Sequence, residues 1–199
     1  MATPLDDEFR GLIEQNLRSS FEHKLEKMIE RRLKIKLQQI VPIHYFSFAL
    51  IECRDMYVAG HFYGCITLCQ SVAEGLSKFL VAKSQQPLLA NGQKTREGKD
   101  FEDRVRRLRA ADVISAAAER AFLLVHADDR NHFHHLNVQI QTDREKLETR
   151  AEECFRALSA VESEVFEAGW NNEGKLVVAR PHLWPINGDR LALSYIRPV

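Results

Sequence analysis

The chain has 199 residues, of which 45% are hydrophobic and 28% are charged, and its 28 Lys and Arg residues balance its 28 Asp and Glu residues. This hydrophobic content is enough for a packed core and excludes global disorder. The formal net charge of zero excludes a general electrostatic attraction to nucleic acid, so any binding of RNA or DNA must depend on local basic patches.

The cysteine and hydropathy patterns predict a cytoplasmic protein without a membrane anchor. The four cysteines fall in apolar helical runs, which indicates buried, reduced thiols: Cys53, Cys65, Cys69 and Cys154. Cys65 and Cys69 are one turn apart, but no second Cys pair or adjacent His completes a zinc site, so we expect no metal there. No run reaches the ~18 apolar residues of a membrane span, and the N-terminus is acidic rather than basic and then apolar as in a signal peptide.

Residues 5–40 are predicted to form one long amphipathic helix. Apolar residues recur at spacings of three and four: Leu5, Phe9, Leu12, Ile13, Leu17, Phe21, Leu25, Met28, Ile29, Leu33, Leu37 and Ile40. An unbroken helix would be roughly 54 Å long, which exceeds the width of a small domain. Its apolar stripe should therefore pack on the far side of its own domain or on another chain, so both a packing arm and a dimerisation arm remain open.

Two further helices are predicted after this segment. Pro42 suits the first turn of a helix at residues 43–58, and Gly60 suits its C-terminal end. Residues 62–83 are apolar on most faces, which predicts the central helix of a bundle. Glu74 is the only acid in this helix and needs a cation or a hydrogen-bond donor if it is buried. We expect a structural role for it, with a role in a functional site as the alternative.

The middle of the chain combines a loop with a basic segment. Residues 84–99 contain Pro87, the Asn91-Gly92 pair and Gly98, which predicts a loop. The segment 100–109 carries four arginines that form either a solvated face or an RNA-binding surface: Arg104, Arg106, Arg107 and Arg109. Residues 112–115 can cap the helix predicted at residues 116–125.

The C-terminal third predicts a helix followed by short strands. Thr142 or Asp143 can cap a helix that runs to about residue 167, with Gly169 as its end. Residues 176–179 and 191–196 are β-type runs, which predict a C-terminal hairpin. Two strands alone are marginally stable, so this hairpin must pack on the bundle or on a partner.

Residues 130–135 connect two predicted helices and concentrate a guanidinium, an amide and three imidazoles in six positions. Arg130 and His135 are five residues apart, or about 140° on a continuous helix, and so would not share a face there. Their pairing requires the helix to end between them. Asn131 allows this, because it tolerates left-handed conformations and suits a C-terminal cap. His132 and His134 are second-rank candidates for the same chemistry.

The pair suits cleavage of RNA by its own 2′-hydroxyl group. A guanidinium binds two phosphate oxygens and stays charged, and an imidazole can take or give a proton near neutral pH. This mechanism requires neither a metal nor another cofactor. Two alternatives remain open: a metal site formed by the His cluster with Asp128, and a structural ion pair between Arg130 and Glu74 or Asp129.

The spacing and setting of Arg130-Asn131-His132-Phe133-His134-His135 resemble the HEPN superfamily (higher eukaryotes and prokaryotes nucleotide-binding domains). Its hallmark is an Arg, a polar residue, three to five variable residues and a His, placed between the last two helices of a bundle. The resemblance covers roughly residues 43–168. It implies a metal-independent endoribonuclease, often a toxin or anti-phage effector, and a homodimer whose two motifs face each other across a two-fold axis.

The sequence therefore predicts an all-α, HEPN-like helical bundle at residues 42–168, with an N-terminal helical arm at 1–41 and a C-terminal β-hairpin at 169–199. The expected function is RNA cleavage, with Arg130 as phosphate clamp, His135 as general acid/base and Asn131 holding the motif. Expected partners are RNA, a second copy and an antitoxin or regulatory protein, and no membrane. The alternatives are a non-catalytic dimeric scaffold and a nucleotide-binding module.

Overall fold

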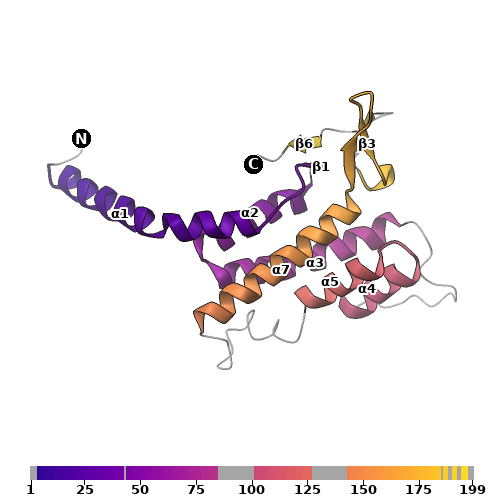
Figure 1. The fold of residues 1–199 in the computed structure, drawn as a ribbon, viewed down its shortest axis with the longest axis horizontal. Helices are drawn as coiled ribbons and strands as arrows, with labels where there is room; N and C mark the ends of the chain where they lie inside the picture. Colours follow the sequence, from indigo (N-terminus) through magenta and orange to yellow (C-terminus); the bar gives the residue numbers. More distant parts are fainter. Residues whose placement is uncertain are drawn as a thin grey trace.

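The computed structural model describes residues 4–42, 44–84, 101–126 and 143–184, together with strand residues 186–187, 190–191 and 194–196. Within these ranges the chain is mostly helical, with small antiparallel strand pairs that involve the C-terminal segment (Figure 1). The predicted all-α class is therefore confirmed. The predicted loop at residues 84–99 lies outside the described residues from residue 85 onward.

The N-terminal helix α1 (Pro4–Lys34) is shorter than predicted, because residues 35–39 lead without regular structure into β1 (Ile40–Pro42). Side chains of helix α7 (Arg144–Val165) explain this correction. Arg156 donates to the Lys34 carbonyl at 2.8 Å, and Ser159 donates to the Lys36 carbonyl at 2.9 Å. These bonds satisfy carbonyl groups at the helix end, and the bundle buries Ile35.

Helices α2 (Tyr45–Ala59) and α3 (Phe62–Lys83) confirm the two helices predicted next. Gly60 ends α2 in a left-handed conformation with φ 81°, as predicted. Helix α3 is central, since it packs against α2, α4 (Phe101–Ala110), α5 (Ala116–Val125) and α7. It is long and apolar enough to cross a membrane, but half of that apolar stretch is buried inside the protein. This burial is the pattern of a core helix.

Two predicted helix caps are present. Ser115 caps α5 by accepting a hydrogen bond from the Ala118 backbone N–H at 3.1 Å. Asp143 caps α7 by accepting from the first backbone N–H groups of that helix. Helix α7 ends at Val165 rather than at Gly169, because the chain turns into strand β2 (Ala168–Trp170).

The predicted C-terminal β-structure is present, but the two runs expected to form its hairpin or ribbon do not pair with each other. The described strands form three antiparallel pairs: β2 with β3 (Leu176–Val178), β4 (Ile186–Asn187) with β5 (Arg190–Leu191), and β1 with β6 (Ser194–Ile196). The two segments expected to pair with each other therefore have different partners. The Asn171 side chain favours the β2–β3 pairing, because it accepts bonds from the Glu173 and Lys175 backbone N–H groups in the turn.

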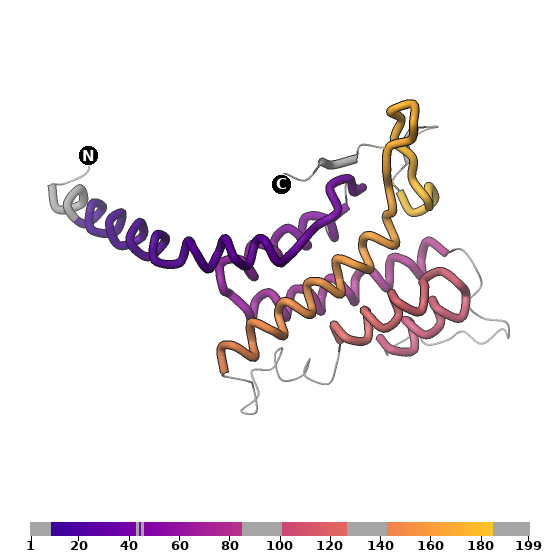
Figure 2. The backbone as a smooth tube through the Cα atoms, viewed as in Figure 1, coloured from indigo at the N-terminus to yellow at the C-terminus, as the bar shows by residue number. Residues whose placement is uncertain are grey.

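The C-terminal segment packs on the bundle. Leu183 ends the 3-10 helix η1 (Pro181–Leu183), and both Leu183 and Trp184 are buried in the core. The Trp184 ring lies edge-on to Phe166, with the ring centroids 6.3 Å apart. Strand β6 pairs with β1, and Leu183 and Trp184 pack in the core of the bundle. The predicted C-terminal segment 169–199 therefore contacts both the end of the predicted arm 1–41 and the predicted bundle 42–168. By contrast, most of α1 extends away from the bundle, and only its last turns lie beside α2 (Figures 1 and 2).

Candidate functional site

The predicted catalytic residues fall in the connection between α5 and α7. All five lie outside the described residues: Arg130, Asn131, His132, His134 and His135. The helices on both sides of this connection are described. Arg150 of α7 donates to the Leu124 carbonyl near the end of α5 at 2.9 Å. Since Arg150 lies beside Leu124, the residues of α7 before Arg150 extend past the end of α5. The start of α7 is also the first described segment after the motif in the sequence.

The start of α7 meets the start of α3 in a cationic corner, which we call the α3–α7 corner. The Arg144 guanidinium donates to the Gly60 carbonyl at 3.3 Å, and the buried Arg31 guanidinium donates to the Val58 carbonyl at 3.3 Å. Both guanidinium groups lie over the Phe62 ring, at 5.1 Å and 5.0 Å from its centroid. Cation–π attraction therefore helps to hold two positive charges beside one another.

Gly60 is required at this corner for two reasons. Its φ of 81° lies in the left-handed region, which glycine adopts without a steric penalty. A Cβ atom at this position would lie 2.9 Å from Nη2 of Arg144 and 3.1 Å from Nη1 of Arg31. The turn between α2 and α3 thus allows two guanidinium groups to approach the backbone closely.

Replacing Gly60 by Ala is expected to lower the free energy of unfolding by about 1–3 kcal/mol, through left-handed strain and crowding of the two guanidinium groups. Equilibrium urea denaturation measures this change. The matched control is Gly11→Ala on α1, where nothing lies within 4 Å of an added Cβ atom. That variant should be neutral or slightly stabilising, and an equal loss in both variants would contradict the assigned role of Gly60.

Ion pairs and hydrogen bonds between α7 and the helices α1 and α2 hold the Arg31 side chain of the α3–α7 corner in place. Arg31 binds Glu148 through two hydrogen bonds of 2.9 Å and 3.1 Å. These bonds lower the pKa of the Glu148 carboxyl below its ordinary value. Tyr57 donates to Glu152 at 2.9 Å, and Glu152 also pairs with Arg156 at 2.7 Å. Burial and the Glu152 carboxylate raise the pKa of Tyr57, so its hydroxyl stays protonated and acts as a donor.

A cavity of about 330 Å³ opens at this corner. Its walls are formed by the starts of α3 and α7: Gly60, His61, Phe62, Tyr63, Gly64, Arg144 and Leu147. His61 makes no capping bond to α3 through its side chain, and the first N–H groups of a helix form its positive end. A helix start beside a guanidinium and an imidazole suits an anion of phosphate size.

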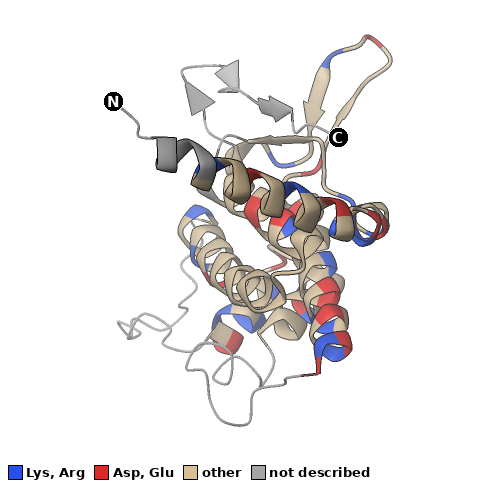
Figure 3. Ribbon diagram, turned by 90° about the vertical axis from the view of Figure 1, so that its left-hand side faces the viewer, with Lys and Arg blue, Asp and Glu red and all other residues tan. Residues whose placement is uncertain are grey.

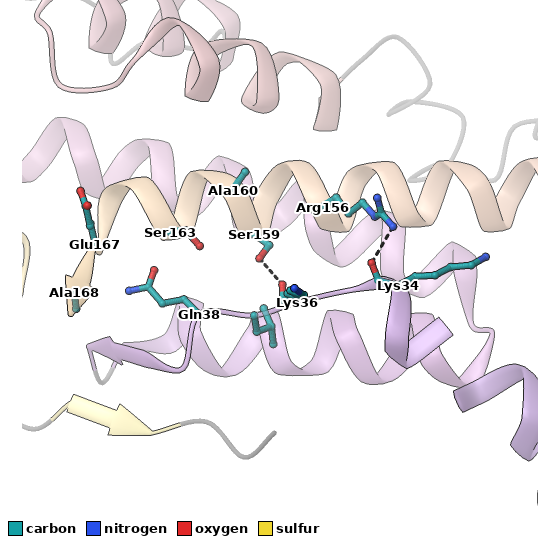
Figure 4. A pocket seen from close by; sticks show the side chains of 10 residues that line it. Lys34, Lys36, Gln38, Arg156, Ser159, Ala160, Ser163, Glu167 and Ala168 are labelled. Atoms are coloured by element: carbon teal, nitrogen blue, oxygen red, sulfur yellow. Dashed lines mark hydrogen bonds between the residues drawn. The ribbon is translucent and has the colours of Figure 1, made fainter. Parts of the chain in front are cut away.

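A larger cavity of about 660 Å³ lies between the irregular segment 35–39 and α7 (Figure 4). The polar groups in it are largely occupied by backbone bonds. Arg156 binds the Lys34 carbonyl and Ser159 binds the Lys36 carbonyl, as the dashed lines show, while Gln38 donates to the Phe166 carbonyl. The described residues that line this cavity include none of the predicted site residues. We therefore interpret it as the crevice that remains where α1 ends early.

Glu74 lies on α3 and is partly exposed rather than deeply buried. Its carboxylate pairs with Lys78, one turn along the same helix, at 3.0 Å. Ser77, on the next turn, donates to the Glu74 carbonyl at 2.8 Å. The described cation beside Glu74 is thus a Lys of its own helix. The ion pair with Arg130 that the sequence allows involves a residue outside the described part of the chain.

Arg104 serves the packing of α4 on α3. Its side chain is buried, its Nε donates to the Ser77 hydroxyl at 2.9 Å, and its guanidinium lies 5.8 Å from the centroid of the Phe101 ring. The burial of its side chain leaves little of this guanidinium accessible to a phosphate. We therefore remove Arg104 from the RNA-binding surface predicted from the sequence.

The other three arginines of the basic segment are exposed or partly exposed, but each has an acidic partner. The pairs are Arg106 with Glu102 (2.9 Å), Arg107 with Asp103 (2.7 Å) and Arg109 with Asp112 (3.2 Å). Figure 3 shows basic and acidic positions interspersed on the described helices. The segment is therefore less positive as a surface than its four arginines suggest, and RNA binding there remains a prediction.

Sequence reasoning missed the α3–α7 corner. Arg31 and Glu148 are 117 residues apart, so no local spacing indicates that they pair. The available signal was weaker: Arg144 and Glu148 are one turn apart at the start of a helix, and Gly60 precedes an apolar helix without a capping side chain. This pattern indicates a polar helix start but does not identify Arg31 as its partner.

No group of three or more His, Cys, Asp or Glu side chains is arranged to hold a metal ion within the described residues. The four cysteines are free and buried. Hydrogen bonds with Cys53 and Cys65, together with burial, raise the pKa of the Cys69 thiol, so it stays protonated. Comparison of the chain with protein-family models, curated proteins and solved structures finds no match.

Proposed function

We propose that this chain is a metal-independent endoribonuclease of the HEPN type. Arg130 clamps the scissile phosphate, His135 transfers protons, and Asn131 holds the motif. The observation that carries this proposal is the position of the motif, in the connection between α5 and α7, the last two α-helices described. That position matches the helical order of the family that the motif resembles.

The reaction divides into one bond formed and one bond broken. The 2′-oxygen of the RNA attacks the phosphorus, the bond from phosphorus to the 5′-oxygen breaks, and a 2′,3′-cyclic phosphate and a free 5′-hydroxyl result. His135 takes the proton of the 2′-hydroxyl or gives a proton to the leaving 5′-oxygen. Arg130 stabilises the charge that develops on the phosphate. Two copies of the chain, paired as a homodimer, supply a second histidine for the other proton transfer.

The α3–α7 corner supports this proposal from the described part of the chain. Arg144, His61 and the start of α3 surround a cavity that suits a phosphate, and Arg144 follows the motif by nine residues. Flanking phosphates of a bound RNA could reach this corner. Arg106, Arg107 and Arg109 are further candidate RNA contacts, each of which must exchange its acidic partner for a phosphate.

The cellular role we propose is that of a cytoplasmic toxin or anti-phage effector, held in check by an antitoxin or regulatory protein. Four buried free thiols fit a reducing compartment. The near-neutral sequence pI of 7.1 and the absence of excess positive charge fit an enzyme that acts on selected RNA rather than binding all nucleic acid.

Incubation of the purified protein with structured and single-stranded RNAs in EDTA tests the proposal. We expect cleavage without added metal, with 2′,3′-cyclic phosphate and 5′-hydroxyl ends on the products. EDTA silences metal-dependent contaminants, and the product ends identify attack by the 2′-hydroxyl group. A metal-independent contaminant would leave the same ends, so His135→Ala prepared in the same way is the control that assigns the cleavage to this chain. Intact RNA across all substrates would overturn the proposal.

The second candidate is a non-catalytic dimeric scaffold. The ion pairs of α4 favour it, because Arg106, Arg107 and Arg109 each bind a carboxylate of their own chain and so offer less charge to RNA. A nucleotide-binding module is the remaining alternative, and ligand-dependent shifts in melting temperature would reveal it.

A further inference from the structure

Helix α1 carries a ridge of large apolar side chains that the rest of its own chain leaves exposed. We call these residues the α1 ridge; they recur every four positions: Phe9, Ile13, Leu17, Phe21, Leu25, Ile29 and Leu33. Their exposed fractions range from 40% for Leu25 to 78% for Leu33, and Leu12 beside the ridge is 54% exposed. Contiguous apolar surface of this kind marks an interaction site rather than ordinary scatter.

The C-terminal turn of α1 is bonded to the bundle, while most of the helix is exposed to solvent. Arg31 is buried and bonded to Glu148 and to the Val58 carbonyl, and Lys34 lies 3.8 Å from Glu152. In contrast, every residue from Phe9 to Lys27 is exposed. Figure 1 shows this part of the helix leaving the bundle. The exposed part is roughly 30 Å long at 1.5 Å per residue, and an isolated helix of that length is only marginally stable in water.

We infer that the α1 ridge pairs with the α1 ridge of a second copy of this chain. An identical ridge on each copy can pack against the other across a two-fold axis, so no second kind of surface is needed. Side chains spaced four apart form one of the ridges by which helices interlock, and two such ridges pack into each other's grooves at a crossing angle of about −50°.

The charges beside the ridge fit a second copy better than a membrane or a nucleic acid. Between Phe9 and Glu30 the basic and acidic side chains balance: Arg10, Arg18, Lys24 and Lys27 against Glu14, Glu22, Glu26 and Glu30. A helix that binds anionic lipid or RNA carries an excess of Lys and Arg on its polar face. A neutral helix of alternating sign neither repels its own copy nor attracts a polyanion.

The apolar area is enough for a weak contact that depends on protein concentration. Side chains spaced four apart rotate by about 40° per step around a helix, so one crossing helix covers only the central part of the ridge. A large apolar side chain carries on the order of 150 Å². Burial of the exposed half of about four such side chains on each copy would remove roughly 600 Å² from water, which is the area of a small interface. Since the last turns of α1 remain on the bundle, the pairing links two folded bundles through their arms. This inference rests on the proposed function in one respect: we take the arm contact as the one that holds together the two copies of the proposed nuclease.

The test is the mass of the full-length protein in solution, measured by sedimentation and light scattering over a series of protein concentrations. We expect twice the 22.9 kDa of one chain for the wild type. The variant Leu17→Gln, Phe21→Gln, Leu25→Gln should sediment as one chain and keep its far-ultraviolet circular dichroism from the bundle. The matched control Ser19→Gln, His23→Gln changes the opposite side of the same helix turns and should remain a dimer.

Two outcomes would overturn the inference: a wild type that is monomeric throughout the series, or a triple variant that remains a dimer. A dimeric triple variant would place the contact elsewhere and leave the proposed nuclease intact. A monomeric wild type that sediments with phosphatidylcholine or phosphatidylserine vesicles, while the triple variant does not, would identify a membrane as the partner of the ridge. RNA cleavage is measured separately, so failure of the arm contact and failure of the nuclease proposal are distinguishable.

Discussion

Replacing Glu148 by Ala is expected to lower the free energy of unfolding by about 2–3 kcal/mol. The Arg31 side chain is only 7% exposed and relies on Glu148 for its two strongest hydrogen bonds. Removal of the carboxylate leaves a buried charge with only the Val58 carbonyl as a described acceptor. Because the Glu148 side chain is itself 29% exposed, water can partly replace it, which keeps the loss below the roughly 3–5 kcal/mol expected for a fully buried pair.

Urea denaturation at neutral pH measures this loss, and Glu153→Ala is the matched control. Glu153 lies on the same helix, is 53% exposed, and approaches Arg150 only at 3.9 Å. Its replacement should change the unfolding free energy by less than about 0.5 kcal/mol. Equal losses in the two variants would mean that the effect arises from helix α7 in general and not from the contact with Arg31.

The same contact predicts how stability depends on pH. Arg31 lowers the pKa of Glu148 in the folded state below its ordinary value of 4.5. The stabilisation is therefore present above pH 4.5 and is lost as the pH falls through the lowered pKa, because the unfolded state then binds more protons than the folded state. The wild type should lose more stability than Glu148→Gln when the pH is reduced from 6 to about 3. Parallel curves would contradict this linkage.

The sequence predicts the helices whose signals are local. Residues 62–83 are apolar on most faces, and Ser115 and Asp143 provide hydroxyl and carboxylate caps at the required positions. The end of α1 could not be predicted in this way. The apolar spacing continues to Ile40, but Arg156 and Ser159 capture backbone carbonyls of the segment from more than 120 residues away. Tertiary bonds therefore override a helical pattern at that point.

Strand pairing and the polar corner depend on the same kind of distant partner. Residues 191–196 have β character, but nothing in their composition indicates that residues 194–196 pair with β1, which lies near the other end of the chain. Likewise, the sequence around Arg31 is that of an amphipathic helix with many charged residues, and nothing in it indicates that Arg31 is buried against Glu148. The helix over residues 5–34 was predicted correctly from its apolar spacing. Which of its apolar side chains the bundle covers could not be predicted, because that depends on where the helix lies on the bundle.

Replacing His135 by Ala is expected to reduce the rate of RNA cleavage by about 10²–10⁴-fold, the usual contribution of a positioned general acid or base. This is the largest effect that we predict, and it applies to the proposed nuclease. The matched control is His182→Ala, which removes an exposed imidazole from η1, outside the proposed site. Cleavage by the control should equal that of the wild type. His132→Ala and His134→Ala should lose less activity than His135→Ala if His135 is the proton-transfer group.

Two substitutions of Arg130 distinguish its proposed role in RNA cleavage from a general attraction of its charge to RNA. Arg130→Lys keeps the positive charge but loses the fork that binds two phosphate oxygens, so cleavage should fall well below that of the wild type while RNA binding changes little. Arg130→Ala should lose both. Unfolding curves that match the wild type establish that each variant is folded. Full activity of folded His135→Ala would show that the cleavage does not use this imidazole, and the proposed catalytic role of His135 would then be wrong.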